Sequence, residues 1–170
     1  MKNFAFLLIC MSLFVVVTAT ARDDEEDTYR YELENYTDRT MSDGYIMVKV
    51  WNYGRKEKIT RQTCMRNAVH GVIFKGVSGG RASGLNKGHA ALCPDGYSAH
   101  TDYFDNFFNS GDYMQFVELT NNGNIQAGDR IKISSKEYKI AMVCIINYNA
   151  LRDRLQKDGV AKGLNSLFTR

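Results

Sequence analysis

One stretch decides the fold of this chain: Gly44 to Gly76, which reads GYIMVKVWNYGRKEKITRQTCMRNAVHGVIFKG. Its first part, Tyr45 to Tyr53, is rich in β-branched and aromatic residues, a composition typical of a strand. Side chains alternate between the two faces of a strand, so Ile46, Val48 and Val50 point to one face. The other face consists of Met47, Lys49, Trp51 and Tyr53. Only one of these four side chains is charged, so we expect the second face to be covered in part.

The second half of the stretch predicts an amphipathic helix. After a basic turn at Arg55-Lys56, the hydrophobic period changes from Glu57 onward. The apolar residues then fall on one stripe of a helix: Met65, Ala68, Val69, Val72 and Ile73. Gly71 costs about 1 kcal/mol relative to Ala inside a helix, which predicts a close approach of the helix to the sheet. Gly76 is placed to end the helix in a left-handed conformation.

Further elements follow along the chain. The patterns predict a helix over Ser98 to Ser110 capped by Ser98, strands over Tyr113 to Leu119, Arg130 to Ser134 and Glu137 to Tyr148, and a helix from the cap Asn149 to Lys157. The strand that begins at Glu137 is apolar on both faces, so we expect it to lie centrally in the sheet. The fold class is therefore α+β, with one small antiparallel or mixed sheet backed by two main helices. We place this domain at residues 43–170, with a glycine-rich loop over residues 76–99.

The N-terminal segment predicts export. Lys2 precedes an apolar run from Phe4 to Val17, and Ala19-Thr20-Ala21 has the form of a signal-peptide cleavage site. We therefore expect residues 1–21 to be removed and the protein to be periplasmic, secreted or associated with the outer membrane, without a transmembrane span after cleavage. Residues 22–42 form an acidic segment, predicted to be a flexible leader, although Tyr29, Tyr31 and Leu33 alternate as in a short edge strand.

The charge of the chain is close to neutral once the predicted signal peptide is set aside. Residues 1–21 hold one of the 22 basic residues and none of the 19 acidic residues, so basic residues exceed acidic ones by two in the remainder. A balance this close to zero gives no electrostatic case for nucleic acid as a partner.

Three cysteines remain after cleavage, which is an odd number for an exported protein. A bridge between Cys64 and Cys93 would close a loop of about 30 residues and contribute roughly 3–4 kcal/mol in the chain-entropy model. The alternative is that Cys64, Cys93 and Cys144 are all free thiols that behave as small buried hydrophobic groups. The sequence leaves both possibilities open.

The candidate binding residues are Tyr97, Asp102, Tyr103, Phe104 and Arg81. Aromatic rings beside carboxylates can form a platform for a sugar ring, and Arg81 lies in the neighbouring glycine-rich loop. A simpler alternative is that the segment from Tyr103 is a helix that buries its rings and leaves its acids in water.

Motifs for catalysis or metal binding are not found in the sequence. His70, His89 and His100 form no zinc-binding spacing, and no serine lies in a nucleophile elbow. A thiol nucleophile at Cys64 or Cys93 would need a histidine brought close by the fold, together with a lowered pKa. We predict no cofactor and no metal, and the sequence leaves enzymatic activity open.

The segment VKVWNYGRKEKITRQTCMRNAVHGVIFKG, followed by a long strand and a helix near the C-terminus, resembles small α+β modules of Gram-negative cell envelopes. These include the Lpp20-like lipoproteins and the N-terminal domain of the flagellar assembly protein FlgT. In both, a strand leads into a helix with Ala and Val at the spacing that Ala68, Val69, Val72 and Ile73 have here. The whole chain also resembles exported proteins of Bacteroidota. The long glycine-rich loop and the missing lipidation site depart from the lipoproteins.

This resemblance implies an envelope role and supplies no catalytic residue to carry over. The function we expect is that of a non-enzymatic periplasmic or outer-membrane-associated binding or assembly module, with an envelope protein or a glycan as partner. Two alternatives stay open: a glycan or peptidoglycan binder, and a small thiol-dependent hydrolase of the envelope.

Overall fold

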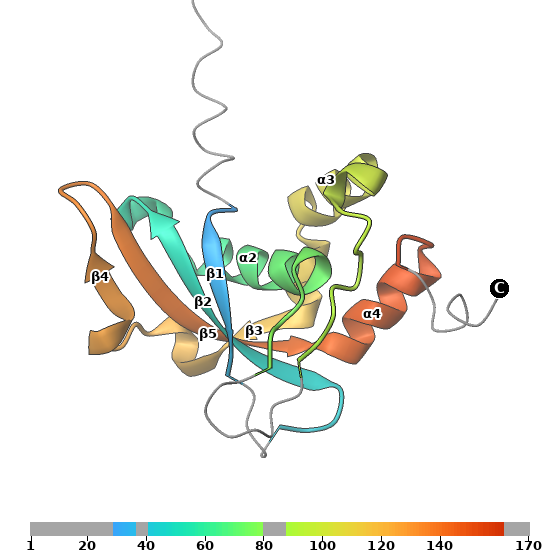
Figure 1. Ribbon diagram of the computed structural model, residues 1–170, viewed down its shortest axis with the longest axis horizontal. Helices are drawn as coiled ribbons and strands as arrows, with labels where there is room; N and C mark the ends of the chain where they lie inside the picture. Colours follow the sequence, from blue (N-terminus) through green and yellow to red (C-terminus); the bar gives the residue numbers. More distant parts are fainter. Residues whose placement is uncertain (1–28, 37–40, 80–87, 162–170) are drawn as a thin grey trace, which may run out of the picture.

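A five-stranded antiparallel sheet forms the base of the fold, and a helix lies across one of its faces (Figure 1). The computed structural model describes residues 29–36, 41–79 and 88–161. The strands are β1 (Tyr31–Asn35), β2 (Tyr45–Gly54), β3 (Val117–Leu119), β4 (Arg130–Lys132) and β5 (Tyr138–Asn147). Their order is β1-β2-β5-β3, and β4 also pairs with β5. The α+β class is therefore confirmed, with antiparallel pairing throughout the described strands.

Strand β5 is the central strand, as its sequence predicts. It pairs with β2 along its whole length, while β3 and β4 pair with its opposite edge. Ile140, Cys144 and Ile146 face the core, and Ala141 on the other face is also buried. A strand with neighbours on both edges has to be apolar on both faces, which explains its composition.

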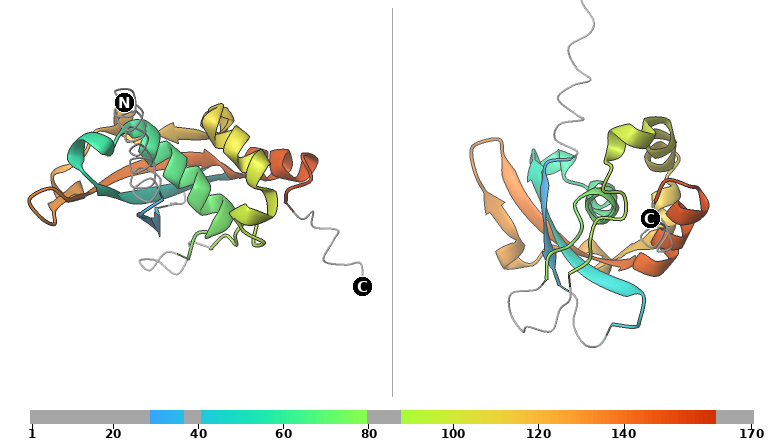
Figure 2. Two further views of the ribbon diagram at one scale, coloured as in Figure 1. Left: turned by 90° about the horizontal axis from the view of Figure 1, so that it is seen from above. Right: turned by 45° about the vertical axis from the view of Figure 1, so that its right-hand side comes forward.

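Helix α2 (Arg61–Phe74) is the helix that backs the sheet. It starts later than the change of period at Glu57, because Lys56–Lys58 form a separate 3-10 turn. Thr60 caps the helix, its side-chain oxygen accepting a hydrogen bond from the Thr63 N–H at 3.1 Å. Most of the predicted stripe is buried: Ala68, Val69, Val72 and Ile73 have no exposed surface, and Met65 is partly buried. Figure 2 shows the sheet curving around this helix.

Two glycines of the central stretch do what the sequence predicts. A Cβ atom at Gly71 would lie 2.0 Å from Leu33 Cδ1, so the helix approaches strand β1 so closely that a side chain at that position would require Leu33 to move. Gly76 has a φ of +70°, the left-handed conformation that follows the end of α2.

Helices α3 (Thr101–Asn109) and α4 (Tyr148–Lys157) complete the fold, and α3 runs beside α2 (Figure 2). Both predicted caps are wrong. Residues Tyr97–His100 form a 3-10 turn, so α3 begins after Ser98. Strand β5 ends at Asn147, and that side chain caps α4 by accepting from the Ala150 N–H at 3.1 Å, in place of Asn149.

Two further boundaries differ substantially from the sequence prediction. Strand β1 lies within the segment 22–42 that was predicted to be a leader, so the edge-strand alternative describes Tyr31 and Leu33 correctly. The predicted strand from Tyr113 is a strand only in β3, because Asp112–Phe116 form a 3-10 turn. Both Tyr113 and Phe116 are buried, and a 3-10 turn places residues three apart on one side, which a strand does not.

The predicted signal peptide and most of the acidic leader lie outside the described residues. Within the part of the chain that the structure describes, no helix has the length and apolar character needed to cross a membrane.

The two glycines that follow α2 and α4 allow a matched test of the tight contact at Gly76. Gly76 and Gly159 both have positive φ, but a Cβ at Gly76 would lie 2.6 Å from the His89 carbonyl oxygen, whereas at Gly159 it would meet nothing within 4 Å. We expect Gly159→Ala to cost about 1 kcal/mol of unfolding free energy, the cost of the left-handed conformation alone. Gly76→Ala should cost at least about 2 kcal/mol, because backbone atoms must also move.

Urea denaturation of both variants measures this difference. Equal losses for the two variants would show that the close approach of residue 89 to Gly76 contributes nothing to stability.

Candidate functional site

The predicted aromatic platform lies on the 3-10 turn Tyr97–His100 and on α3, but its rings face the core more than the solvent. Phe104 has no exposed surface, and its ring centroid lies 5.5 Å from that of Tyr97 and 5.1 Å from that of Tyr103. Asp102 is exposed in the first turn of α3. Arg81 lies outside the described residues.

The two tyrosine hydroxyls of this group are engaged by carboxylates. Tyr97 donates to Asp105 Oδ1 at 2.6 Å, and Tyr103 donates to Asp158 Oδ2 at 2.7 Å. Burial first, and then the carboxylate partner, raises the pKa of both phenols well above its usual range. The structure thus brings the rings of Tyr97, Tyr103 and Phe104 together, whereas Asp102 lies exposed on the surface of α3.

His70 lies in an aromatic cluster between β1, α2 and α3. Its Nδ1 atom is 2.6 Å from the Tyr31 hydroxyl, and its ring centroid is 4.1 Å from that of Tyr29 and 4.8 Å from that of Phe74. Burial, reinforced by the positive charges of Lys75 and Arg66, lowers the pKa of His70 to about 3. A neutral imidazole is therefore the form that holds β1 against α2 at ordinary pH.

The three cysteines of the described residues are free and buried, so, of the two possibilities that the sequence leaves open, the Cys64–Cys93 bridge is not formed. The Cys93 N–H donates to the Ile73 carbonyl at 2.8 Å, which places Cys93 at the C-terminal end of α2. Cys64 lies near the N-terminal end of the same helix. At 1.5 Å per residue it is about 13 Å from Ile73 along the helix axis. A disulfide requires Cα atoms within about 7 Å, so this pairing is excluded by the length of the helix.

Neither thiol environment favours a nucleophile. Burial, and secondly the charge of Asp95, raises the pKa of Cys93 to about 11. Contact with Cys64, followed by burial, raises the pKa of Cys144 well above its usual range. Reactive cysteines have a lowered pKa, so Cys93 and Cys144 have the opposite character.

The sheet face that points away from α2 carries a feature that the sequence analysis missed. Lysine and arginine side chains alternate with aromatic rings across β1, β2 and β5. Lys139 Nζ lies 5.0 Å from the ring centroids of both Trp51 and Tyr53, and Lys49 Nζ lies 5.2 Å from that of Trp51. At one end of this row Arg30 lies over the Tyr53 ring at 5.1 Å. The contacts of Lys139 and Arg30 are cation–π contacts between segments far apart in the chain, which no pattern within one strand predicts, whereas Lys49 and Trp51 lie two residues apart on the same face of β2.

Each cation of this row also has a carboxylate partner. Lys49 pairs with Asp129 at 2.5 Å, Lys139 with Glu32 at 2.8 Å, and Arg30 with Glu137. These charges are already satisfied inside the molecule, so the row covers the rings of the sheet and offers little net charge to a ligand.

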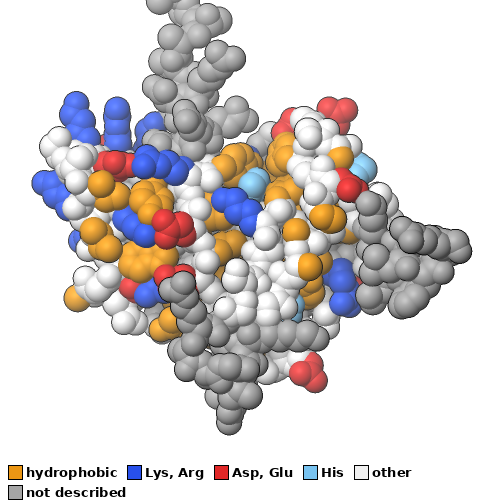
Figure 3. Space-filling view, viewed as in Figure 1, with side chains coloured by type: hydrophobic (Ala, Val, Ile, Leu, Met, Phe, Trp, Pro, Cys, Tyr) orange, Lys and Arg blue, Asp and Glu red, His pale blue; other side chains and the backbone are white. Residues whose placement is uncertain are grey.

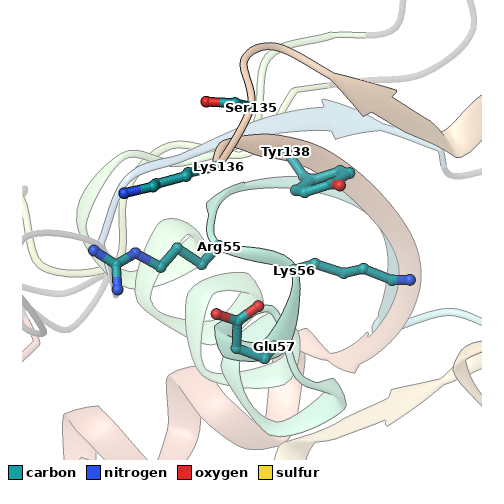
Figure 4. A pocket seen from close by; sticks show the side chains of 6 residues that line it. All are labelled: Arg55, Lys56, Glu57, Ser135, Lys136 and Tyr138. Atoms are coloured by element: carbon teal, nitrogen blue, oxygen red, sulfur yellow. The ribbon is translucent and has the colours of Figure 1, made fainter.

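A groove of about 410 Å³ adjoins this row at the end of the sheet (Figure 4). It lies between the 3-10 turn after β2 and the β4–β5 hairpin, and it is lined by Arg55, Lys56, Glu57, Ser135, Lys136 and Tyr138. Figure 4 shows Arg55 and Lys136 extending in the same direction while Lys56 extends the other way. Within residues 29–36, 41–79 and 88–161, no carboxylate forms an ion pair with any of these three cations.

Charged side chains are unevenly distributed along the molecule, and the groove lies where the basic ones gather. Lys and Arg gather around the hairpin end, where Arg55, Lys56, Lys58, Arg130, Lys132 and Lys136 outnumber the acids. The opposite end, around α3, carries Asp95, Asp102, Asp105 and Asp112. Figure 3 shows most of the blue side chains on the left, where red ones also lie among them. The near-neutral total therefore conceals a local excess of basic side chains around the hairpin.

A metal centre finds no support in the described part of the chain, where no three His, Cys, Asp or Glu residues cluster in a way that would hold an ion.

Comparison with protein-family models, curated proteins and solved structures gives no match to this chain. The resemblance to envelope modules therefore stays a prediction from the sequence.

The His70 environment predicts a loss of stability in mild acid. The folded pKa lies below the unfolded value of about 6.5, so the contribution is present above pH 6.5 and is lost as the pH falls toward 3. We expect the unfolding free energy to fall by up to about 1.4 kcal/mol per pH unit from this group across that window. Urea denaturation between pH 7 and pH 4 measures the loss, and His70→Gln provides the control because it cannot titrate. Identical pH dependence in the two proteins would contradict the assignment.

The Cys93 environment predicts slow alkylation. With a pKa of about 11, only about one molecule in 10,000 carries the thiolate at pH 7. We expect iodoacetamide to label native Cys93 negligibly at pH 7, and to label it at the ordinary rate of a free thiol once the chain is unfolded in urea. Rapid labelling of the native protein at pH 7 would show that a reactive thiolate is present and would revive the thiol-hydrolase alternative.

Proposed function

We propose that this protein is a non-enzymatic binding or assembly module of the bacterial cell envelope that holds an acidic protein surface at its basic groove. The observation that carries the proposal is that Arg55, Lys56 and Lys136 line one groove and that none of them has an ion-pair partner among the described residues. Like charges from two segments repel one another in the free protein, and a partner that brings carboxylates relieves this repulsion.

The shape of the groove supports a protein partner. Its two walls come from the turn after β2 and from the β4–β5 hairpin, and Tyr138 and Ser135 add a ring and a hydroxyl to the cations. An acidic segment can place carboxylates on the guanidinium of Arg55 and an apolar group on the ring of Tyr138. Ile131 and Ile133 of the same hairpin are each 47 % exposed and extend the apolar part of this surface.

The side chains on which catalysis or glycan binding would depend have their contacts in the interior of the protein. Cys93 is buried and His70 is half-buried, in environments that keep the thiol protonated and the imidazole neutral, respectively. Phe104, a residue of the alternative glycan platform, lies in the core with its ring out of reach of a sugar. These placements favour docking at the groove over the two alternative functions.

The proposal is tested by capture of partners from detergent-solubilised native envelopes. The tagged protein is compared with Lys56→Glu/Lys136→Glu, and captured proteins are quantified by mass spectrometry. We expect one envelope protein to be recovered in near-stoichiometric amount with the native sequence and to fall at least about tenfold with the variant, since two attractive pairs become repulsive. Raising the salt from about 50 to 500 mM should weaken capture in the same direction.

The matched control is Arg152→Glu/Lys157→Glu, which makes the same change of charge on α4, away from the groove. This control should keep the partner. Recovery of the tagged chain alone, or of a partner that all three proteins hold equally, would contradict the proposal.

A further inference from the structure

Two thiols from different layers of the fold face each other in the core. Cys64 lies on α2 and Cys144 on β5, and their Sγ atoms are 3.7 Å apart although the residues are 80 positions apart in the chain. Neither residue has any exposed surface. The contact joins the sheet-facing side of the helix to the inner face of the central strand.

We propose that Cys64 and Cys144 form a disulfide in the exported protein, that this bond links α2 to β5, and that Cys93 stays a free thiol. The sulfur atoms already lie near van der Waals contact, so small side-chain rotations bring them to the bonding distance of about 2.05 Å without moving the helix away from the sheet. The proposal rests on export, because an oxidising compartment is where such bonds form and persist.

The third thiol cannot compete for either partner in the folded chain. Cys93 Sγ donates to the Val160 carbonyl oxygen at 3.3 Å, on the far side of the C-terminal end of α2 from Cys64. Its fixed place there gives Cys93 a packing role, which accounts for an odd number of cysteines after residue 21 although only one bridge forms.

The chemistry requires an oxidant that carries a disulfide, such as a thiol–disulfide oxidoreductase or oxidised glutathione. One cysteine thiolate attacks the oxidant's disulfide, which forms a mixed disulfide and releases one oxidant thiol. The second cysteine thiolate then attacks the protein sulfur of that mixed disulfide and releases the second oxidant thiol. The two protein thiols lose two protons and two electrons, and the oxidant is reduced to two thiols. Since both cysteines are buried in the native state, the exchange takes place before folding is complete.

Peptide mapping of the native sequence decides the pairing. The protein is produced with its own N-terminal segment in a bacterial host that forms disulfides, free thiols are blocked in acid, and the unreduced sample is digested with trypsin. The bridge predicts that QTCMR (Gln62 to Arg66) is linked to IAMVCIINYNALR (Ile140 to Arg152), 2 Da lighter than the sum of the free peptides, while the peptide 88–130 carries a blocked Cys93. A link to Cys93, or three blocked thiols, would overturn the inference.

Failure of export is kept separate from failure of the bridge. If the chain stays in the reducing cytoplasm, it is unfolded and refolded in a buffer of reduced and oxidised glutathione, and the same peptide map is recorded. Formation of the Cys64–Cys144 link in that buffer supports the inference even where the envelope role fails. Its absence there overturns the inference.

Stability supplies a second measurement. We expect reduction to lower the midpoint of thermal unfolding of the native protein by about 10 °C or more, because the bond closes a long loop in the unfolded chain. Cys93→Ala should show the same shift on reduction, and Cys64→Ala/Cys144→Ala should show none. If the double variant does not fold, the shift in the native sequence and in Cys93→Ala still decides the question, and no shift in either would overturn the inference.

Discussion

The burial of one helical stripe against the inner face of β2 and β5 is the constraint on which the rest of this structure depends. Val48 and Val50 on the sheet meet Val69 and Val72 on α2, and none of the four is exposed. Each such side chain contributes about 1.5–3 kcal/mol relative to an exposed one. Within this apolar contact, Asn67 Nδ2 donates to Asn52 Oδ1 at 2.8 Å, a buried polar contact that fixes the position of the helix along the strand.

That contact also determines which side chains of β2 lie on the other face of the sheet. Because β2 alternates strictly, placing Val48 and Val50 under the helix turns Trp51 and Tyr53 toward the uncovered side. Lysine and arginine side chains lie over these rings and are themselves paired with carboxylates, so the uncovered face exposes little bare aromatic surface. The unpaired cations are concentrated beyond the end of the sheet, where the turn after β2 meets the β4–β5 hairpin. The groove is therefore a consequence of where the longest pair of strands stops.

Strand β1 shows how the same constraint reaches the edge of the fold. The absence of a side chain at Gly71 lets Leu33 and Tyr31 lie directly on α2, and His70 one residue earlier meets the Tyr31 hydroxyl. The close approach of the helix was predictable from Gly71 alone. The identity of its neighbour was not, because the acidic, polar composition around β1 is typical of a flexible segment and the strand is stable only through its contacts with β2 and α2.

The sequence by itself determined the strand, turn and helix of the central stretch, the central place of β5 and the α+β class. These follow from the periods of apolar residues and from glycine conformation, which are local properties that each segment carries on its own. Only the tertiary structure decided which cysteines meet, which rings face solvent, and where unpaired cations gather. Those outcomes depend on contacts between residues far apart in the chain, as Cys64 and Cys144 show: the stripe of α2 turns Cys64 toward the sheet, and the register of β5 against β2 puts Cys144 beneath it. The sequence pattern of α2 or of β5 alone does not predict that the two thiols meet, because their proximity depends on how the helix packs on the strand.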